Sequence, residues 1–442
     1  MAAEKPVSVA DQIRRLLGHL GIEQAHFAGR LPTDWAELAA AAPEVFCSLT
    51  LVGPMAVDVP AANRLGSRLM VLNGDHGQIA DRLRGVMTQL PQARLVALAG
   101  CNALGWTDVV AEHATPIGDA MIDFLAPAEA NSGVKAVAGV KPEGEVDGIT
   151  YRVRGKGAPL ILLPLFLAPS QWEPLVARLS ERYCTITLGG AALGAVAILE
   201  SRGRSPGYQR MLGTLVDEAQ LRPGESVLEV GSGTGVIARW LAHRTGKKNR
   251  IVGVDINNYL LGEAQALVDR DGLQSSVEFR QGNAEELPFP DNSFDVTISV
   301  TVIEEVDADR LLAEMRRVTR PGGRVAVICR SVDTAFIRNV TLGPALKAKV
   351  DAPGGNVSEK GCADASLYAR FIQAGLTAVK KFPQLAVFDQ TDTTALQFME
   401  DNFLPRLAPS EVKEWRAARA SAEAAGTFFM AWPHHCAVGT KA

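Results

Sequence analysis

A glycine-rich turn between an expected strand and an expected helix constrains this chain more than any other feature. The run VLEVGSGTG, residues 227–235, places Gly231, Gly233 and Gly235 within five residues. Glycine permits positive φ angles and lets a ligand approach the backbone closely, so the turn fits a βα connection that binds a nucleotide-like cofactor. A tight turn without a ligand has the same pattern, and the spacing by itself does not decide between the two.

After residue 207, apolar stretches typical of buried parallel strands alternate with helical stretches. The strands are expected at SVLEVG, RIVGVDI, VEFRQG, FDVTISV and RVAVICR, which are residues 226–231, 250–256, 277–282, 294–300 and 324–330. The helices are expected at 235–245, 258–271 and 308–320, the last ending at RPGG. This order predicts an α/β fold with a doubly wound parallel sheet, whose ligands bind at the carboxyl ends of the strands.

Polar residues follow two of these strands. Asp255 closes the second strand, 20 residues after Gly235, where a carboxylate can accept hydrogen bonds from both hydroxyls of a ribose. Asn283 and Ala284 follow the third strand, where an adenine amino group could be recognised. The turn lacks the GxGxxG spacing and a GKT sequence, so a pyrophosphate is a poor fit.

Residues 205–330 resemble class I S-adenosylmethionine-dependent methyltransferases, in particular the ubiquinone/menaquinone-biosynthesis type. The motifs VLEVGSGTG, VGVDI, GNAEELPFPDNSFD and LAEMRRVTRPGGRVAV carry the resemblance. It implies S-adenosylmethionine as the cofactor, with the glycine turn against its methionine part and Asp255 on its ribose. The implied cofactor-binding residues are Glu229, Gly231, Ser232, Gly233, Gly235, Asp255, Ile256, Asn283, Ala284, Glu285 and Val300.

Two of these positions carry alternatives. The resemblance places Glu229 near the cofactor's ammonium group, whereas the alternative is a buried acid capped by backbone amides. The position of Asn283 is usually aspartate in the family and binds adenine N6. Asparagine can make that contact only if its amide presents the carbonyl oxygen.

Candidate residues for binding or deprotonating the methyl acceptor, here called acceptor-side residues, follow the fourth strand. Thr301, Glu304 and Glu305 are the polar residues there, and either glutamate could serve as a base or bind a cationic acceptor. We take Glu304 as the catalytic candidate. The alternative is a solvated helix start, where acidic side chains are favoured.

The tail GTFFMAWPHHCAVGTK, residues 426–441, is expected to form the last antiparallel strands. Adjacent side chains of a strand point to opposite faces, so His434 and Cys436 share one face and His435 takes the other. His434 and His435 are candidate general bases or acceptor-binding groups, and the alternative is a strand end with hydrogen-bonded imidazoles. Two ligands on one face do not make a zinc site, so we expect no metal.

Residues 359–376 are expected to cover the acceptor, and Cys362 could face the pocket. A catalytic role for this thiol is disfavoured because no histidine is near it in the sequence. Several aromatic side chains could line an apolar pocket or belong to the core: Phe336, Tyr368, Phe371, Phe428, Phe429 and Trp432.

The first 200 residues resemble the two halves of an α/β-hydrolase in inverted order, as in a circular permutation. Residues up to about 127 resemble the C-terminal half, and GITYRVRGKGAPLILLPLFLAP and its continuation resemble the N-terminal half. Residues 128–147 would be the linker between them, and 201–207 a short hinge. The expected domains are therefore residues 1–200 and a methyltransferase domain at 205–442.

The catalytic residues of that hydrolase family are missing from the matching positions. Leu31 stands where the G-x-S-x-G motif has its serine, Gly77 where the acid is expected although Asp75 is close, and Ala103 at the histidine position. The pair Pro164 and Leu165 replaces the oxyanion-hole motif. Without a nucleophile and a base there is no route for acyl transfer. We therefore expect a pseudo-hydrolase that serves dimerisation, covers the methyltransferase site or adds a wall to it.

The charge and composition of the chain limit the kinds of binding partner that we expect. The chain carries a net charge of −4, with acidic and basic residues interspersed, which disfavours nucleic acid and a membrane surface. The N-terminus lacks the apolar region of a signal peptide, and the run at 158–169 is too short to span a bilayer. The six cysteines lack zinc or CxxC spacing, which indicates free thiols in a reducing cytoplasm.

Three functions remain open at this point. The favoured one is a cytoplasmic, homodimeric methyltransferase for a small-molecule acceptor, with a non-catalytic hydrolase-like domain. The second is a bifunctional enzyme whose front half still hydrolyses esters. The third is a scaffold that binds the cofactor without turnover.

Overall fold

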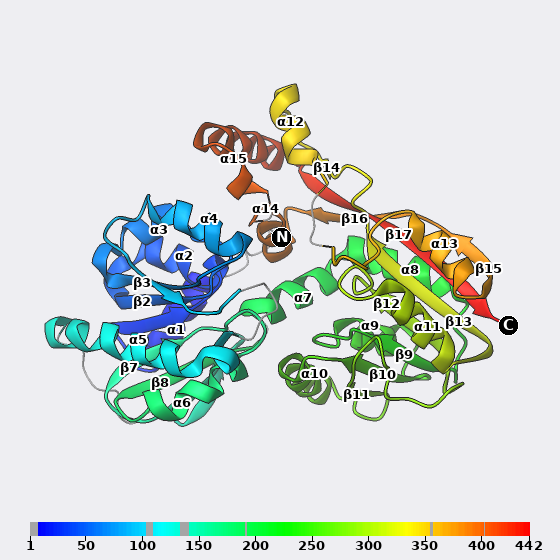
Figure 1. The fold of residues 1–442 in the computed structure, drawn as a ribbon, viewed down its shortest axis with the longest axis horizontal. Coiled ribbons are helices and arrows are strands. Elements are labelled where there is room, and N and C mark those ends of the chain that lie inside the picture. Colours follow the sequence, from blue (N-terminus) through cyan, green and yellow to red (C-terminus); the bar gives the residue numbers. More distant parts are fainter. Residues whose placement is uncertain (1–7, 103–108, 133–140, 191, 354–356, 402) are drawn as a thin grey trace, which may run out of the picture. The chain divides into compact units, whose positions relative to one another are not determined.

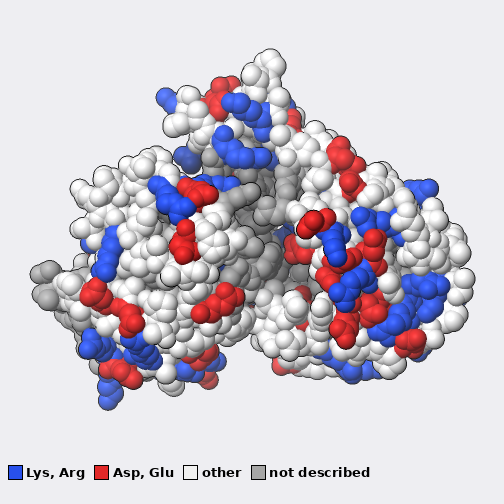
Figure 2. All heavy atoms as spheres, in the orientation of Figure 1, with Lys and Arg blue, Asp and Glu red and all other residues white. Residues whose placement is uncertain are grey.

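The computed structural model describes residues 8–102, 109–132, 141–190, 192–353, 357–401 and 403–442. These residues form two compact units, Met1–Ala197 and Ile198–Ala442, each with its own sheet (Figure 1). No helix in these ranges combines the length and the apolar character needed to cross a bilayer. On the face shown in Figure 2, basic and acidic side chains are interspersed over both units.

The first unit contains an eight-stranded sheet with the order β4-β3-β2-β1-β7-β8-β6-β5. Its strands are β1 (Ala25–Gly29), β2 (Phe46–Val52), β3 (Leu69–Gly74), β4 (Arg94–Leu98), β5 (Glu143–Val146), β6 (Ile149–Arg154), β7 (Ala158–Leu162) and β8 (Tyr183–Gly189). Strand β6 is antiparallel to β5 and β8, and the other neighbouring strands are parallel. The helices are α1 (Val9–His19), α2 (Pro32–Ala41), α3 (Val59–Asn63), α4 (Gln78–Met87), α5 (Val109–Ser132) and α6 (Glu173–Leu179).

The expected connectors are shorter than the sequence indicated. The stretch 128–147 begins within helix α5 and ends with strand β5. Alanine and glutamate in its first part are good helix formers, which explains why the helix continues into it. Helices α7 (Gly194–Arg204) and α8 (Pro206–Glu218) occupy most of the stretch 201–207, and Ser205 alone separates them.

The second unit contains a nine-stranded mixed sheet with the path β11-β10-β9-β12-β13-β17-β14. Each expected parallel strand is present: β9 (Ser226–Val230), β10 (Arg250–Asp255), β11 (Val277–Gln281), β12 (Phe294–Val300) and β13 (Thr319–Arg330). The helices between them, α9 (Val236–Arg244), α10 (Asn258–Arg270) and α11 (Ala308–Val318), also match the expected ranges. This part of the chain therefore has a Rossmann-like α/β fold, as predicted.

The C-terminal tail forms one long strand, β17 (Phe429–Lys441), drawn in red beside β13 in Figure 1. It is antiparallel to β13 and also pairs with β14 (Ile337–Arg338), β15 (Leu376–Lys381) and β16 (Gln384–Asp389). The expected antiparallel strands are thus confirmed as a single strand. Helices α12 (Pro344–Asp351), α13 (Ser366–Gln373), α14 (Thr393–Asp401) and α15 (Pro409–Ala424) complete the unit.

Both faces of this sheet are buried, which is why its parallel strands are continuous apolar runs. Along β9, Val227 belongs to one core cluster, whereas Leu228 and Val230 belong to the cluster on the opposite face. Along β17, Cys436 faces the first of these clusters and Ala437 the second. This alternation assigns each polar side chain near the strand ends to one face of the sheet.

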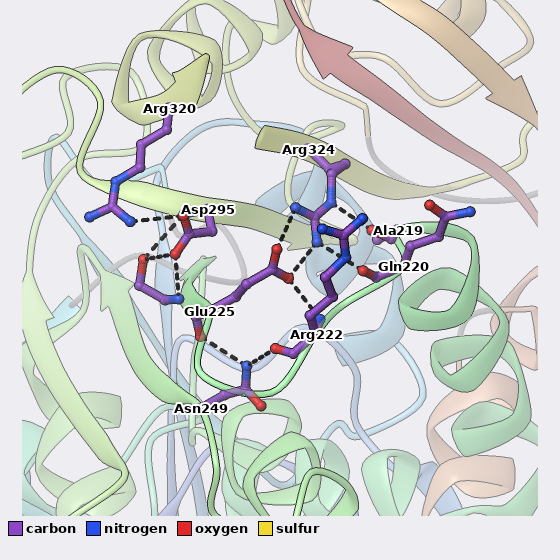
Figure 3. Close-up of polar contacts among 9 residues, drawn as sticks. Ala219, Gln220, Arg222, Glu225, Asn249, Asp295, Arg320 and Arg324 are labelled. Carbon is purple, nitrogen blue, oxygen red and sulfur yellow. Dashed lines mark hydrogen bonds and ion pairs between the residues drawn. The ribbon is translucent and has the colours of Figure 1, made fainter. Parts of the chain in front are cut away.

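The amino ends of β9, β12 and β13 are joined by a polar network (Figure 3). Arg324 makes two hydrogen bonds to the carboxylate of Glu225, at 2.9 and 2.5 Å, and donates to the carbonyl oxygen of Ala219 at 2.7 Å. Asp295 accepts from the backbone and hydroxyl of Ser226, both at 2.8 Å, and from Arg320. Paired charges with this geometry fix the register of the strands at the edge opposite to the expected site.

Candidate active site

The glycine turn leaves β9 with all three glycines in the left-handed region. Gly231, Gly233 and Gly235 have φ angles of +77°, +52° and +68°, and Gly235 is the N-cap of α9. A Cβ atom on Gly231 would overlap the side chain of Val302. The turn therefore requires glycine both for its conformation and for the space around it.

Asp255, at the end of β10, is bound to this turn. Its Oδ2 accepts a hydrogen bond from the Gly233 amide at 2.8 Å, and its Oδ1 accepts one from the Asn257 amide at 2.9 Å. Burial raises the pKa of Asp255, although these amides counteract the effect. Next to it, Ile256 exposes 66% of its surface, an unusual exposure for a large apolar residue.

Glu229 lies on β9 just before the turn and is only 3% exposed. Its Oε2 atom is buried without a hydrogen-bond partner, and so is the hydroxyl of Ser232. Burial, reinforced by the charge of Asp255, raises the pKa of Glu229 to about 8. A buried carboxyl group with an unbonded oxygen is costly unless a ligand supplies a donor.

The loop after β11 carries the residues expected at the adenine. Asn283 is exposed, and its Oδ1 accepts a hydrogen bond from the Glu285 amide at 2.9 Å, which leaves its second lone pair available. Glu285 accepts a hydrogen bond from the Asp307 amide at 3.0 Å and is half-buried. Ala284 is half-buried beside it, and Val300 is buried at the end of β12.

On the acceptor side, Glu304 is fully buried rather than part of a solvated helix start. Its Oε1 accepts a hydrogen bond from Arg330 Nε at 2.7 Å, whereas its Oε2 has no partner. Glu305 accepts from the same arginine at 3.1 Å. Between β12 and these acids, Thr301 has a φ angle of +56°, which is rare for a β-branched residue and is typical of functional sites.

The two histidines of β17 lie on opposite faces, as expected. Nδ1 of His434 is 3.0 Å from the carbonyl oxygen of Trp432, so Nδ1 carries the proton and Nε2 keeps its lone pair. Burial lowers the pKa of His434 to about 3, so the ring is neutral. His434 is therefore a buried hydrogen-bond acceptor on the face of Cys436.

His435 has a different environment. Its Nδ1 is 3.0 Å from the hydroxyl of Tyr368, and its Nε2 is 2.8 Å from Asp333 Oδ1. The hydrogen bonds to Asp333, from Ser331 and His435, hold its pKa below its usual range despite partial burial. Both nitrogens of His435 are thus engaged within the protein. The described residues include no group of three potential metal ligands.

The aromatic residues considered for one apolar pocket are divided by the sheet. Phe428 and Trp432 pack in the first core cluster, whereas Phe371 and Tyr368 pack in the cluster on the other face. Cys362 is buried in that second cluster, 3.5 Å from the hydroxyl of Ser366. These four aromatic residues thus pack in the two core clusters, which fits the alternative that they belong to the core.

Two polar residues near the site were not identified as candidates from the sequence. The ring of Tyr208, on α8, is fully buried, and its hydroxyl has no hydrogen-bond partner. The guanidinium carbon of Arg202, on α7, lies 5.2 Å from the centre of this ring. Helix α7 is held to α9 because Glu200 accepts hydrogen bonds from Arg239, at 2.6 Å, and from Thr234.

In the first unit, the position expected for a serine nucleophile has no catalytic geometry. Leu31 is buried and has an ordinary extended backbone, with φ −90° and ψ 132°, instead of a strained elbow. Beside it, buried Arg30 donates a hydrogen bond to the carbonyl oxygen of Gly53 at 2.8 Å and a longer one to that of Leu165.

The other expected triad positions also lack catalytic side chains. Gly77 is the N-cap of α4, with φ +95°. Asp75 is exposed and bonded to His76 at 2.5 Å and to the Gly100 amide at 2.8 Å. Pro164 and Leu165 are buried after β7, and Ala103 lies outside the described residues.

The fold and the strand-end residues define the class. The second unit has a Rossmann-like fold, its strands β9 to β13 are similar to a methyltransferase domain, and S-adenosylmethionine is the cofactor that this similarity implies. The family described as "Methyltransferase domain" matches residues 228–327, from β9 to β13.

Among curated relatives, the ubiquinone/menaquinone biosynthesis C-methyltransferase of Vibrio cholerae is 40% identical over 114 residues, covering 26% of this chain and 44% of the relative. The protein of the same name from Hahella chejuensis is also 40% identical over 114 residues, with 46% of its length covered. The chain thus spans less than half the length of these relatives. Among solved structures, the YcgJ protein from Bacillus subtilis has a TM-score of 0.36 and 19% identity, covering 53% of this chain and 98% of that one.

Proposed function

We propose that this protein is an S-adenosylmethionine-dependent methyltransferase for a small-molecule acceptor, and that its first unit is a non-catalytic hydrolase-like domain. The observation that carries the proposal is the unbonded Oε2 of Glu229, buried beside a turn of left-handed glycines to which Asp255 is bound. An unpartnered acid next to bare backbone fits a ligand that is cationic and approaches closely. The residues present therefore fit the expected cofactor.

Each cofactor-side residue has a distinct task in this proposal. Asp255 would bind the ribose hydroxyls, and exposed Ile256 would contact one face of the adenine. Asn283 would accept from the adenine amino group through its remaining lone pair, next to Ala284. Glu229 would bind the ammonium group, which favours its ionised form. When bound, S-adenosylmethionine supplies an electrophilic methyl group.

The acceptor-side residues position a nucleophile and exclude water. His434 presents the lone pair of Nε2, and buried Glu304 presents an unbonded oxygen. Either group can accept a hydrogen bond, or the proton that leaves an oxygen or nitrogen acceptor. In a dry site, positioning contributes much of the acceleration. His435 is assigned a structural role here because Tyr368 and Asp333 occupy its nitrogens.

The strand order of the first unit supports the permuted hydrolase-like domain. Numbered from β5, the strands lie in the order 1-2-4-3-5-6-7-8, which is the order of an α/β-hydrolase sheet. The side chain of Leu31 has no hydroxyl, so the bifunctional alternative is disfavoured. The domain would cover the acceptor site or form a homodimer. We propose a cytoplasmic location because the spacing of the six cysteines indicates free thiols in a reducing compartment.

Calorimetric titration with S-adenosylhomocysteine tests the proposal. We expect binding by the wild-type chain, and a loss of about 1–3 kcal/mol in Asp255→Ala, as for a hydrogen bond to a charged group. Unchanged affinity in this variant would remove Asp255 from the site. Transfer of radioactive methyl groups to a metabolite extract then separates an enzyme from a scaffold. Release of 4-nitrophenol from its acetate ester by the full chain, above the rate in buffer without protein, would favour the bifunctional alternative.

A further inference from the structure

Arg202 is a cation without a counter-ion in the second unit. Among the described residues, its guanidinium takes part in no hydrogen bond or ion pair, and its Nε atom is buried without a partner. Its contact is with the ring of Tyr208, at 5.2 Å, and the hydroxyl of Tyr208 is also unbonded and buried. An unpaired and partly buried cation lowers the stability of the fold. An anionic ligand would supply the missing counter-ion.

The pair belongs to the acceptor side of the site. Burial raises the pKa of Tyr208 and outweighs the opposing charge of Arg202, so its hydroxyl remains a donor. Burial lowers the pKa of His434, and the charge of Arg202 lowers it further. Helix α7 contacts the glycine turn, because Thr234 bonds to Glu200 and a Cβ on Gly233 would lie 3.3 Å from Leu199. The ring of Tyr208 lies 6.5 Å from that of Phe388 on β16, the strand that pairs with β17.

The neighbouring carboxyl groups do not neutralise Arg202. Glu304 and Glu305 are both bonded to Arg330, at 2.7 and 3.1 Å. In the proposed site Glu229 binds the ammonium group of the cofactor and is therefore not the counter-ion of Arg202. None of these acids forms an ion pair with Arg202 in the described structure.

We propose that the methyl acceptor is a small organic anion, a carboxylate or a phenolate, whose charged oxygen is bound by the Arg202 guanidinium and the Tyr208 hydroxyl. This inference rests on the proposed methyltransferase function. A guanidinium presents parallel N–H groups that match an oxyanion, and a tyrosine hydroxyl adds a donor. On the other side, Glu304 Oε2 and His434 Nε2 accept hydrogen bonds, so the same acceptor carries a hydroxyl or amine.

Ligand binding to the full chain saturated with S-adenosylhomocysteine tests the inference without turnover. The probes are two matched pairs: benzoate with benzamide, and 2,4-dinitrophenolate with 2,4-dinitroanisole. We expect the wild type to prefer at least one anion by about tenfold or more over its neutral partner. Arg202→Gln should abolish this preference, whereas Arg202→Lys, which keeps the charge but not the planar group, should retain part of it.

Arg204→Gln is the matched control, because Arg204 is exposed two residues further along the same helix. It should keep the full preference for the anion. Equal binding of both members of each pair by the wild type, or an unchanged preference in Arg202→Gln, would overturn the inference. Failure of S-adenosylhomocysteine to bind the wild type would instead contradict the proposed function, so the two failures are distinguishable. Weaker S-adenosylhomocysteine binding in Arg202→Gln alone would place Arg202 at the cofactor and also overturn the inference.

Discussion

At the amino ends of the strands in the second unit's sheet, here called the amino edge, Arg324 bonds to Glu225 and to the carbonyl oxygen of Ala219, and Asp295 bonds to Ser226 (Figure 3). At the carboxyl edge of the same strands, Glu229, Ser232, Glu304, Tyr208 and Arg202 each keep a buried polar atom without a partner. Both edges are rich in charge. The charged side chains of the amino edge are paired within the protein, although the neutral amide oxygen of Asn249 there is unbonded, whereas several groups of the carboxyl edge, charged ones among them, lack partners. Bonded polar groups stabilise the fold, whereas unbonded ones lower its stability and mark where a ligand completes the site.

The largest effect is expected from a substitution that distorts the backbone of the glycine turn at the carboxyl ends of the strands, here called the carboxyl edge. Gly231→Ala introduces a Cβ at a φ angle of +77° and against Val302, so we expect a loss of about 2–5 kcal/mol in unfolding free energy and loss of cofactor binding. Gly262→Ala is the control, because Gly262 lies on helix α10 with open space around it. It should be neutral or slightly stabilising in chemical denaturation. Equal effects of both variants would contradict the role of the turn.

Removal of an amino-edge charge should affect stability alone. Arg324→Met leaves Glu225 largely buried without its bidentate partner, so we expect a loss of about 2–4 kcal/mol in unfolding free energy. Affinity for S-adenosylhomocysteine, measured by calorimetry on the folded protein, should stay within about twofold, because the network lies at the opposite edge. Arg320→Met, at a more exposed pair with Asp295, should cost only about 0–1 kcal/mol. A large loss of affinity in Arg324→Met would refute the separation of the two edges.

For an acid at the carboxyl edge we expect the reverse, a loss of cofactor affinity without a loss of stability. Glu229→Gln keeps the shape of the side chain but cannot ionise, so affinity for S-adenosylmethionine should fall by about 1–2 kcal/mol. Stability should not fall, because the variant removes a buried ionisable group. Glu286→Gln, at an exposed acid of the loop after β11, should change neither quantity. Loss of stability without loss of affinity in Glu229→Gln would favour the capped structural acid considered from the sequence.

The two edges should also differ in how their contributions to stability depend on pH. The pKa of Glu229 is raised to about 8 from an ordinary value of 4.5, so the wild type should lose stability relative to Glu229→Gln as pH rises between these values. The slope is at most about 1.4 kcal/mol per pH unit.

Glu225 should show the opposite sign. Burial alone would raise its pKa, but hydrogen bonds from Arg324 and from the Arg222 amide outweigh burial and lower it. Its contribution is therefore present above the ordinary value of 4.5 and is lost as pH falls further. Denaturation of the wild type and Glu225→Gln at several pH values measures it. The same sign at both edges would contradict the account.

Much of the second unit could be predicted because its signals are local. Continuous apolar runs fixed the five parallel strands, and three close glycines followed by Asp255 located the turn. Arg202 and Tyr208 could not be predicted, because they come from helices that precede the sheet and reach the site only through tertiary packing. For Glu304 the sequence left open a catalytic base and a solvated helix start, because its burial and its bond to Arg330, 26 residues further along the chain, arise only from tertiary packing.

The central claim is that the bare turn after β9 and the acid closing β10 hold an adenosyl cofactor. A crystal structure of the full chain with S-adenosylhomocysteine tests it most directly. The account predicts ribose hydroxyls within hydrogen-bond distance of Asp255 and the amino group of the ligand near Glu229. A nucleoside bound elsewhere, with both carboxyl groups unoccupied, would contradict it.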